Sequence, residues 1–114
     1  MNLSDRKLGN AIVIDVAGRL DSATTPAFDA YCDKLMAEGA ITFVMNFEKL
    51  DFINSGALRS IILMMKKVKP QGGNIVICGA KGTAKETFEV FGFSNMFPIA
   101  ETMEDAASLL ECGG

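Results

Sequence analysis

Leu50-Asp51-Phe52-Ile53-Asn54-Ser55-Gly56-Ala57-Leu58-Arg59 is the stretch that decides the fold. Residues 41–47, just before it, are almost continuously apolar, which is typical of a strand that is covered on both faces of a parallel sheet. The pattern predicts a buried strand over 41–47, a turn over 48–53 and then an amphipathic helix with Ser55 in its first turn. The apolar residues that recur at helical spacing are Leu58, Ile61, Ile62 and Met65.

Further apolar runs on both sides predict the rest of a sheet. Residues 11–17 are rich in β-branched side chains and are followed by Gly18, so we expect a strand that ends at this glycine. Residues 74–78 have the composition of another buried strand. A shorter strand over 3–8 and a brief edge strand over 97–99 complete the predicted set.

Three further helices are predicted from capping signals. Thr25, followed by Pro26, is a suitable start for the first. Thr83 and Glu86 form a capping box that opens the second, and Thr102 begins the third in a related pattern. The apolar residues that these helices carry are Phe28, Tyr31, Cys32, Leu35 and Met36 in the first, Val90 and Phe91 in the second, and the inward-facing Ala106, Leu109 and Leu110 in the third.

Strands that alternate with helices at this spacing indicate an α/β fold. We expect a mixed central β-sheet of about five strands, mostly parallel, with about four α-helices. Because the chain has 114 residues, we also expect one domain over residues 1–114.

Composition narrows the classes of function. The net charge of −3 argues against nucleic acid as a partner, and the apolar runs are too short for direct membrane insertion. There is no histidine, the commonest general base and metal ligand, so we expect no catalytic residue, no metal and no cofactor. The polar first residues lack a signal-peptide core, which favours a cytoplasmic protein. Cys32 and Cys78 are expected to be reduced thiols in the core.

The chemically important group of residues 50–59 is the hydroxyl of Ser55, which lies at the turn between the predicted strand and the predicted helix. Free N–H groups and the positive end of the helix dipole make a helix N-terminus receptive to negative charge. A phosphoryl group there would add about −1.5 to −2 charges without disrupting the fold. The alternative is that Asn54 or Ser55 only caps the helix, as these residue types commonly do.

These motifs together resemble the STAS domain family, the fold of sulfate-transporter C-terminal domains and of bacterial anti-sigma factor antagonists. The stretch over 50–59 is similar to the family signature, in which leucine, aspartate, an aromatic and an aliphatic residue precede aspartate and serine at a helix start. Residues 18–21 resemble its early glycine-x-leucine-aspartate loop, and residues 91–107 resemble its closing pattern. The resemblance implies a STAS-type fold and a non-enzymatic protein that docks onto a partner.

The resemblance also implies a switch. Ser55 corresponds to a serine that is phosphorylated by the partner, an anti-sigma factor that is also a serine-protein kinase. The unmodified protein would bind this partner and free the sigma factor, and a phosphatase acting on phospho-Ser55 would reverse the release. Asp21 corresponds to an acidic loop residue close to that serine. The residues expected to contact the partner, called the docking face below, are Arg19, Asp21, Ser22, Asn54, Gly56, Arg59 and Leu63.

Three members of this set, Arg19, Asp21 and Leu63, can also be interpreted from the sequence without the resemblance. Arg19 and Asp21 are close enough in sequence for a solvated ion pair of little energetic value. Leu63 falls off the apolar stripe of its helix and Met64 falls at its margin. Apolar residues in such places are either partner contacts or ordinary surface and core residues.

Departures from the family pattern keep other functions open. Asn54 replaces the frequent aspartate before the serine, Asn46 replaces a strand aspartate, and Gly56-Ala57 reverses the usual order of small residue and glycine. They favour, as the alternative, an adaptor subunit of a signalling or lipid-transport assembly that is not phosphorylated. An enzyme or a nucleotide-binding protein is a third hypothesis, although the sequence shows no catalytic constellation and residues 79–83 lack the spacing of a phosphate-binding loop.

Overall fold

The computed structural model describes residues 1–92 and 97–112, the last two of these by their backbone alone. Its elements are β1 (Asn2–Leu8), β2 (Ala11–Leu20), α1 (Thr25–Ala37), β3 (Thr42–Asn46), β4 (Leu50–Ile53), α2 (Ser55–Val68), a 3-10 turn (Lys69–Gln71), β5 (Asn74–Cys78), α3 (Gly82–Val90), β6 (Ile99–Ala100) and α4 (Met103–Cys112). The four predicted helices are all present.

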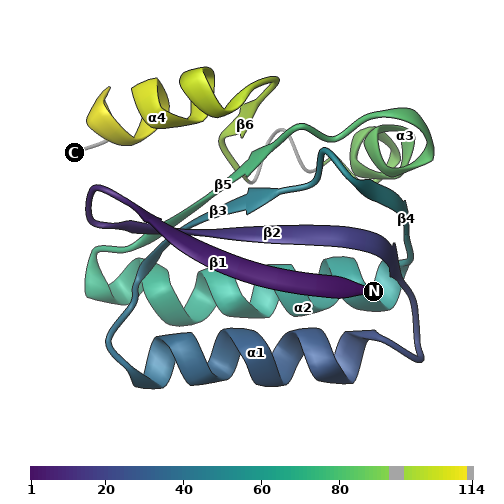
Figure 1. Cartoon of the computed structure of the whole chain (residues 1–114), viewed down its shortest axis with the longest axis horizontal. Coiled ribbons are helices and arrows are strands. Elements are labelled where there is room, and N and C mark those ends of the chain that lie inside the picture. The colour runs from purple at the N-terminus through teal and green to yellow at the C-terminus, as the bar shows by residue number, and fades with distance from the viewer. Residues whose placement is uncertain (93–96, 113–114) are drawn as a thin grey trace.

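The strands form one mixed sheet in the order β1-β2-β3-β5-β6, with β4 paired to the far end of β2. β1 is antiparallel to β2, and all other pairs are parallel. This confirms the predicted α/β fold with a mixed, mostly parallel sheet. The carboxyl ends of the parallel strands therefore share one edge, the edge at which α2 begins (Figure 1).

The two faces of the sheet are covered unequally. α1 and α2 lie side by side against one face, and α4 covers part of the other (Figure 1). The main core lies under α1 and α2 and includes Phe28, Phe43 and Ile61, each at most 1% exposed. A smaller cluster around Val44, Val76 and Ala106 lies beneath α4. Near-continuous apolar strands are expected where both faces of a sheet are covered.

β2 continues past Gly18, and this corrects two predictions. The strand was expected to end at Gly18, but the glycine takes a φ of 97° and bulges the strand instead. Residues 12–15 of β2 pair with β3, and residues 18–20 pair with β4. The predicted turn over 48–53 therefore contains a short strand, because Leu50 and Ile53 are buried and the bulged end of β2 offers them free backbone partners.

Helix starts are the second group of corrections. α3 begins at Gly82 with Lys81 as its N-cap and no side-chain cap, so the capping box of Thr83 and Glu86 is wrong. Thr25 is the first residue of α1 rather than its cap, and Thr24 precedes it. The third start was correct, since the amide of Asp105 donates to Thr102 Oγ1 over 3.1 Å. α3 has only nine residues, and only Ala84 and Phe88 of them are buried. The apolar pattern of so short a helix does not determine the residue at which it begins.

Three apolar residues of the predicted helices are exposed, and one of them, Leu109, was predicted to face inward. Val90 and Phe91, at the end of α3, are 82% and 52% exposed, and Leu109 on α4 is 38% exposed. The buried positions are occupied by Ala84 and Phe88 on α3 and by Ala106 on α4. Of these three, Ala106 was predicted to face inward. The predicted edge strand over 97–99 begins at Ile99, two residues later.

The cysteines behave as predicted where the structure describes them. Cys32 and Cys78 are free and buried. Burial, followed by nearby carboxylates, raises the pKa of Cys32 to about 12 and that of Cys78 to about 11. Both thiols therefore stay protonated and unreactive at neutral pH. Of the helices within 1–92 and 97–112, none has the length and apolar character needed to cross a bilayer.

Candidate functional site

The end of β2 and the end of β4 bring the predicted docking face together. Arg19 pairs with Phe52 and Leu20 with Ile53 in the parallel register of these strands. The amide of Asn54 then donates to the carbonyl of Leu20 over 3.0 Å. The loop that follows β2 is thereby fixed beside the first turn of α2, although the two are more than 30 residues apart in sequence.

Asn54 is the residue that joins this loop to the helix. Its backbone is extended, and its Oδ1 accepts a hydrogen bond of 2.9 Å from the amide of Ala57. Its Nδ2 donates to Ser22 Oγ over 3.4 Å. Asn54 is therefore the N-cap of α2, so the replacement of the family's aspartate keeps the capping function.

Replacing Asn54 with alanine should lower the free energy of unfolding by about 1 kcal/mol, because one of the orphan amides of α2 loses its acceptor. Chemical denaturation measures the change. Asn54→Asp is the matched control and should remain close to the parent protein, since aspartate caps equally well. An unchanged stability of the alanine variant would show that water replaces the cap at no cost.

Ser55 is exposed at the first position of α2. Because Asn54 provides the cap, the hydroxyl of Ser55 is not needed for capping. No other described residue forms a hydrogen bond with this hydroxyl. The backbone amides of this first turn carry the positive end of a 14-residue helix. The geometry offers an accessible nucleophilic oxygen at a place that accommodates negative charge.

Asp21 holds the loop after β2 in shape. Its Oδ1 accepts the amides of Ala23 at 3.0 Å and Thr24 at 3.2 Å. Desolvation pushes the pKa of Asp21 upward, but these amides, the Thr24 hydroxyl and Arg19 outweigh it, and the pKa is lowered from its usual value. Asp21 is therefore charged at neutral pH, and one of its oxygens is already used by the loop.

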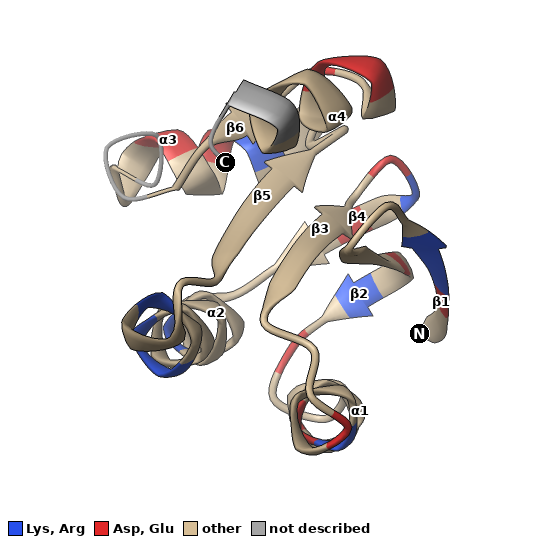
Figure 2. Ribbon diagram, turned by 90° about the vertical axis from the view of Figure 1, so that its left-hand side faces the viewer, with Lys and Arg blue, Asp and Glu red and all other residues tan. Residues whose placement is uncertain are grey.

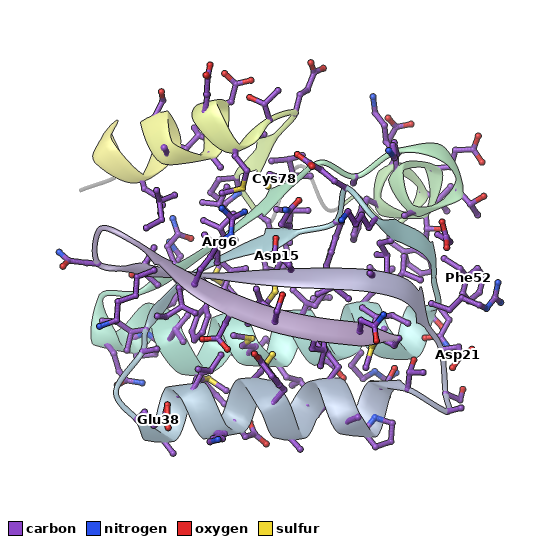
Figure 3. The ribbon with its side chains drawn as sticks, in the orientation of Figure 1. Arg6, Asp15, Asp21, Glu38, Phe52 and Cys78 are labelled. Atoms are coloured by element: carbon purple, nitrogen blue, oxygen red, sulfur yellow. The ribbon has the colours of Figure 1, made fainter. Side chains whose placement is uncertain are left out.

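Arg19 and Phe52 form the rim of the site beside Asp21. The guanidinium carbon of Arg19 lies 4.3 Å from the centre of the Phe52 ring, and its Nε lies 3.7 Å from Asp21 Oδ2. Phe52 and Asp21 lie at the same end of the molecule (Figure 3). Sequence reasoning missed Phe52 because it placed the residue in a turn. The available signal was the apolar character of residues 50–53.

The remaining predicted contacts follow the outer side of α2. Gly56, Arg59 and Leu63 are exposed, and the exposed fraction of Leu63 is 50%. Met64, the other residue left open from the sequence, is 4% exposed and belongs to the core. The structure thus places all seven residues of the docking face on two segments: the end of β2 with the loop after it, and α2 with its N-cap. Ser55 lies on the second segment, next to Asn54.

Gly56→Ala should stabilise the protein slightly, by about 0.5 kcal/mol, because alanine is the better helix former. A Cβ at this position would meet only Asn54 Oδ1, at an ordinary 3.5 Å, and the backbone of Gly56 is not left-handed. Thermal unfolding measures the effect. A loss of stability would mean that the fold itself requires glycine at position 56. Close contact with a partner would then no longer be needed to explain the glycine.

The site is a surface rather than a cavity. Hollows of about 670 and 790 Å³ lie elsewhere, one at the opposite edge of the sheet and one between α3 and β6, and Ser55 lines neither. Within the described ranges, no three histidine, cysteine or acidic residues gather in a way that could hold a metal ion. Leu63 of the docking face lines only a small hollow of about 120 Å³, so the exposed residues around Ser55 favour contact with another macromolecule over enclosure of a small molecule.

Comparison with known proteins points to one family of domains. The family model described as the STAS domain matches residues 2–106. BtrV of Bordetella bronchiseptica, which bears the name of an anti-sigma factor antagonist, is 30% identical over 108 residues, or 95% of this chain and 93% of that protein. The structure of an anti-sigma factor antagonist from Mycobacterium paratuberculosis has a TM-score of 0.83 at 21% identity, covering 96% of this chain and 93% of that one. The Bacillus cell fate determinant SpoIIAA in its phosphorylated form has a TM-score of 0.73 at 21% identity, covering 96% and 99%. These two structures share the fold of this chain.

Proposed function

This chain belongs to the STAS domain family, and from that premise we propose that it is an anti-sigma factor antagonist, a non-enzymatic protein that docks onto an anti-sigma factor. The full-length likeness to BtrV supports the role. The observation that carries the proposal is the exposed Ser55 hydroxyl, left free at the start of α2 because Asn54 makes the cap.

The finer part of the proposal is that phosphorylation of Ser55 switches docking off. The partner is then an anti-sigma factor with serine-kinase activity, and a phosphatase restores the binding form. The existence of a phosphorylated structure for SpoIIAA shows that this fold accommodates a phosphate in that protein. In this chain the serine is exposed between Asn54 and Gly56 of the docking face, so an added phosphate would meet a partner that covers these residues.

Energetics explain why the switch acts on docking and not on folding. The helix dipole favours negative charge at the first turn by about 0.3–1 kcal/mol, so the phosphorylated chain stays folded. A partner that covers Ser55 must instead remove water from a dianion that it cannot pair. The desolvation of an uncompensated charge costs several kcal/mol, which is enough to release the partner.

The alternative is an unphosphorylated adaptor, and one capture experiment separates the two. Wild-type protein and Ser55→Asp are used as baits in an extract of the native cell, and the retained proteins are identified by mass spectrometry. We expect a kinase-type anti-sigma factor on the wild-type bait and its loss on the aspartate bait. Transporter subunits on both baits would support the adaptor and contradict the antagonist.

A further inference from the structure

All charged side chains on α2 are positive. The helix carries Arg59, Lys66 and Lys67 and has no acidic residue between Ser55 and Val68, in a protein whose net charge is −3 (Figure 2). Lys67 is paired with Asp33 of α1, Nζ to Oδ1, over 3.5 Å. For Arg59, no acidic group in the described part of the chain lies within ion-pair distance.

Arg59 lies one helical turn beyond Ser55, on the same side of α2. Residues four apart on a helix have their Cβ atoms about 6 Å from each other, and an acidic group before a basic one is the favourable order. Both residues are exposed, while the neighbours Ala57, Leu58 and Ile61 occupy the buried side. A negative group on Ser55 is therefore within reach of the guanidinium of Arg59.

Other cations near Ser55 are less suited to this role. Arg19 already lies over the ring of Phe52 and beside Asp21. Lys66 is 11 residues further along, or about 16 Å along the helix axis, beyond the screening length of about 8 Å in physiological salt. On the packed elements, Asp21 after β2, Asp51 on β4 and Asp29 on α1 bring negative charge to the same end, which repels a phosphate.

We propose that Arg59 is the residue that responds to phosphorylation of Ser55: unpaired in the unmodified protein, it forms an intrahelical ion pair with the phosphate. This rests on the proposed function and names its internal mechanism. The unmodified helix then offers a free guanidinium to an acidic group of the partner. The phosphate withdraws that guanidinium from the docking face at the same time as it adds charge.

A phosphorus NMR titration tests the pairing without any kinase. Phosphoserine is installed at position 55 by genetic encoding, and the second ionisation of the phosphate, normally near pH 6, is followed in the parent, in Arg59→Ala and in Arg59→Lys. Pairing favours the dianion. Arg59→Ala should therefore raise the phosphate pKa by about 0.3, a twofold change in its protonation equilibrium, and Arg59→Lys should retain most of the lowering.

Lys66→Ala is the matched control, because it removes the same charge from the same helix at a distance. Its phosphate should titrate as in the parent. Identical titration of the parent and Arg59→Ala would overturn the proposal, and so would an equal rise in Lys66→Ala, which would indicate a general field. Circular dichroism confirms that each variant is folded. Failure of a kinase to modify Ser55 would contradict the proposed function and leave this titration unaffected.

Discussion

Ser55→Asp is expected to weaken binding of the anti-sigma factor about 100-fold or more and to leave the melting temperature equal to or slightly above that of the wild type. The two effects have opposite signs because the same charge meets two environments. At the exposed first position of α2 it interacts favourably with the helix dipole. Under a bound partner it is desolvated and unpaired, at a cost of about 3 kcal/mol.

The measurements are calorimetric titration of the partner and thermal unfolding of the free protein. Ser55→Ala is the neutral control and should keep both affinity and stability, because the hydroxyl of Ser55 takes no part in capping α2. Unaltered binding by the aspartate variant would show that the partner does not cover this position. A large fall in its melting temperature would show that the charge acts on folding instead.

Phe47→Ala should produce the largest loss of stability, about 3–5 kcal/mol, from the removal of a buried aromatic side chain. Phe47 is fully buried between β3 and β4, and its ring stacks on Phe88 of α3 with 5.6 Å between the centroids. Since domains of this kind are stable by only about 5–15 kcal/mol, the melting temperature should fall by about 15 °C or more. Differential scanning calorimetry provides the measurement.

The matched control for Phe47→Ala is Phe52→Ala, the same truncation five residues later. Phe52 is only partly buried and contacts Arg19 by its ring face, so its loss should cost about 1 kcal/mol. If the two variants lost equal stability, the stack of Phe47 on Phe88 would not be the contact that holds α3 against the sheet.

Most of the fold could be predicted because the core strands are apolar on both faces. The apolar runs around Val44 and Val76 can be buried on both faces only at the centre of a covered sheet. The path of β2 beyond Gly18 could not be predicted in the same way. A glycine with positive φ ends some strands and bulges others, and only the position of Leu50 and Ile53 across the sheet decides between them.

The position of the candidate site in the sequence could be predicted, but most of the contacts within the site could not. Ser55 at the start of a helix followed from the apolar spacing after it. That Asn54 rather than Ser55 makes the cap depends on an extended backbone and on one hydrogen bond to Ala57. The stacking of Arg19 on Phe52 depends on the register between β2 and β4, which local sequence does not encode.

The most direct test of the central claim compares one protein with and without phosphate on Ser55. The phosphorylated and unmodified forms are each titrated with the anti-sigma factor, and each is unfolded alone in denaturant. We expect the phosphorylated form to lose the partner while its unfolding midpoint stays within experimental error of the unmodified form. Equal affinity of both forms would contradict a switch that acts on docking, and so would a phosphorylated form that loses the partner but also unfolds at a far lower denaturant concentration.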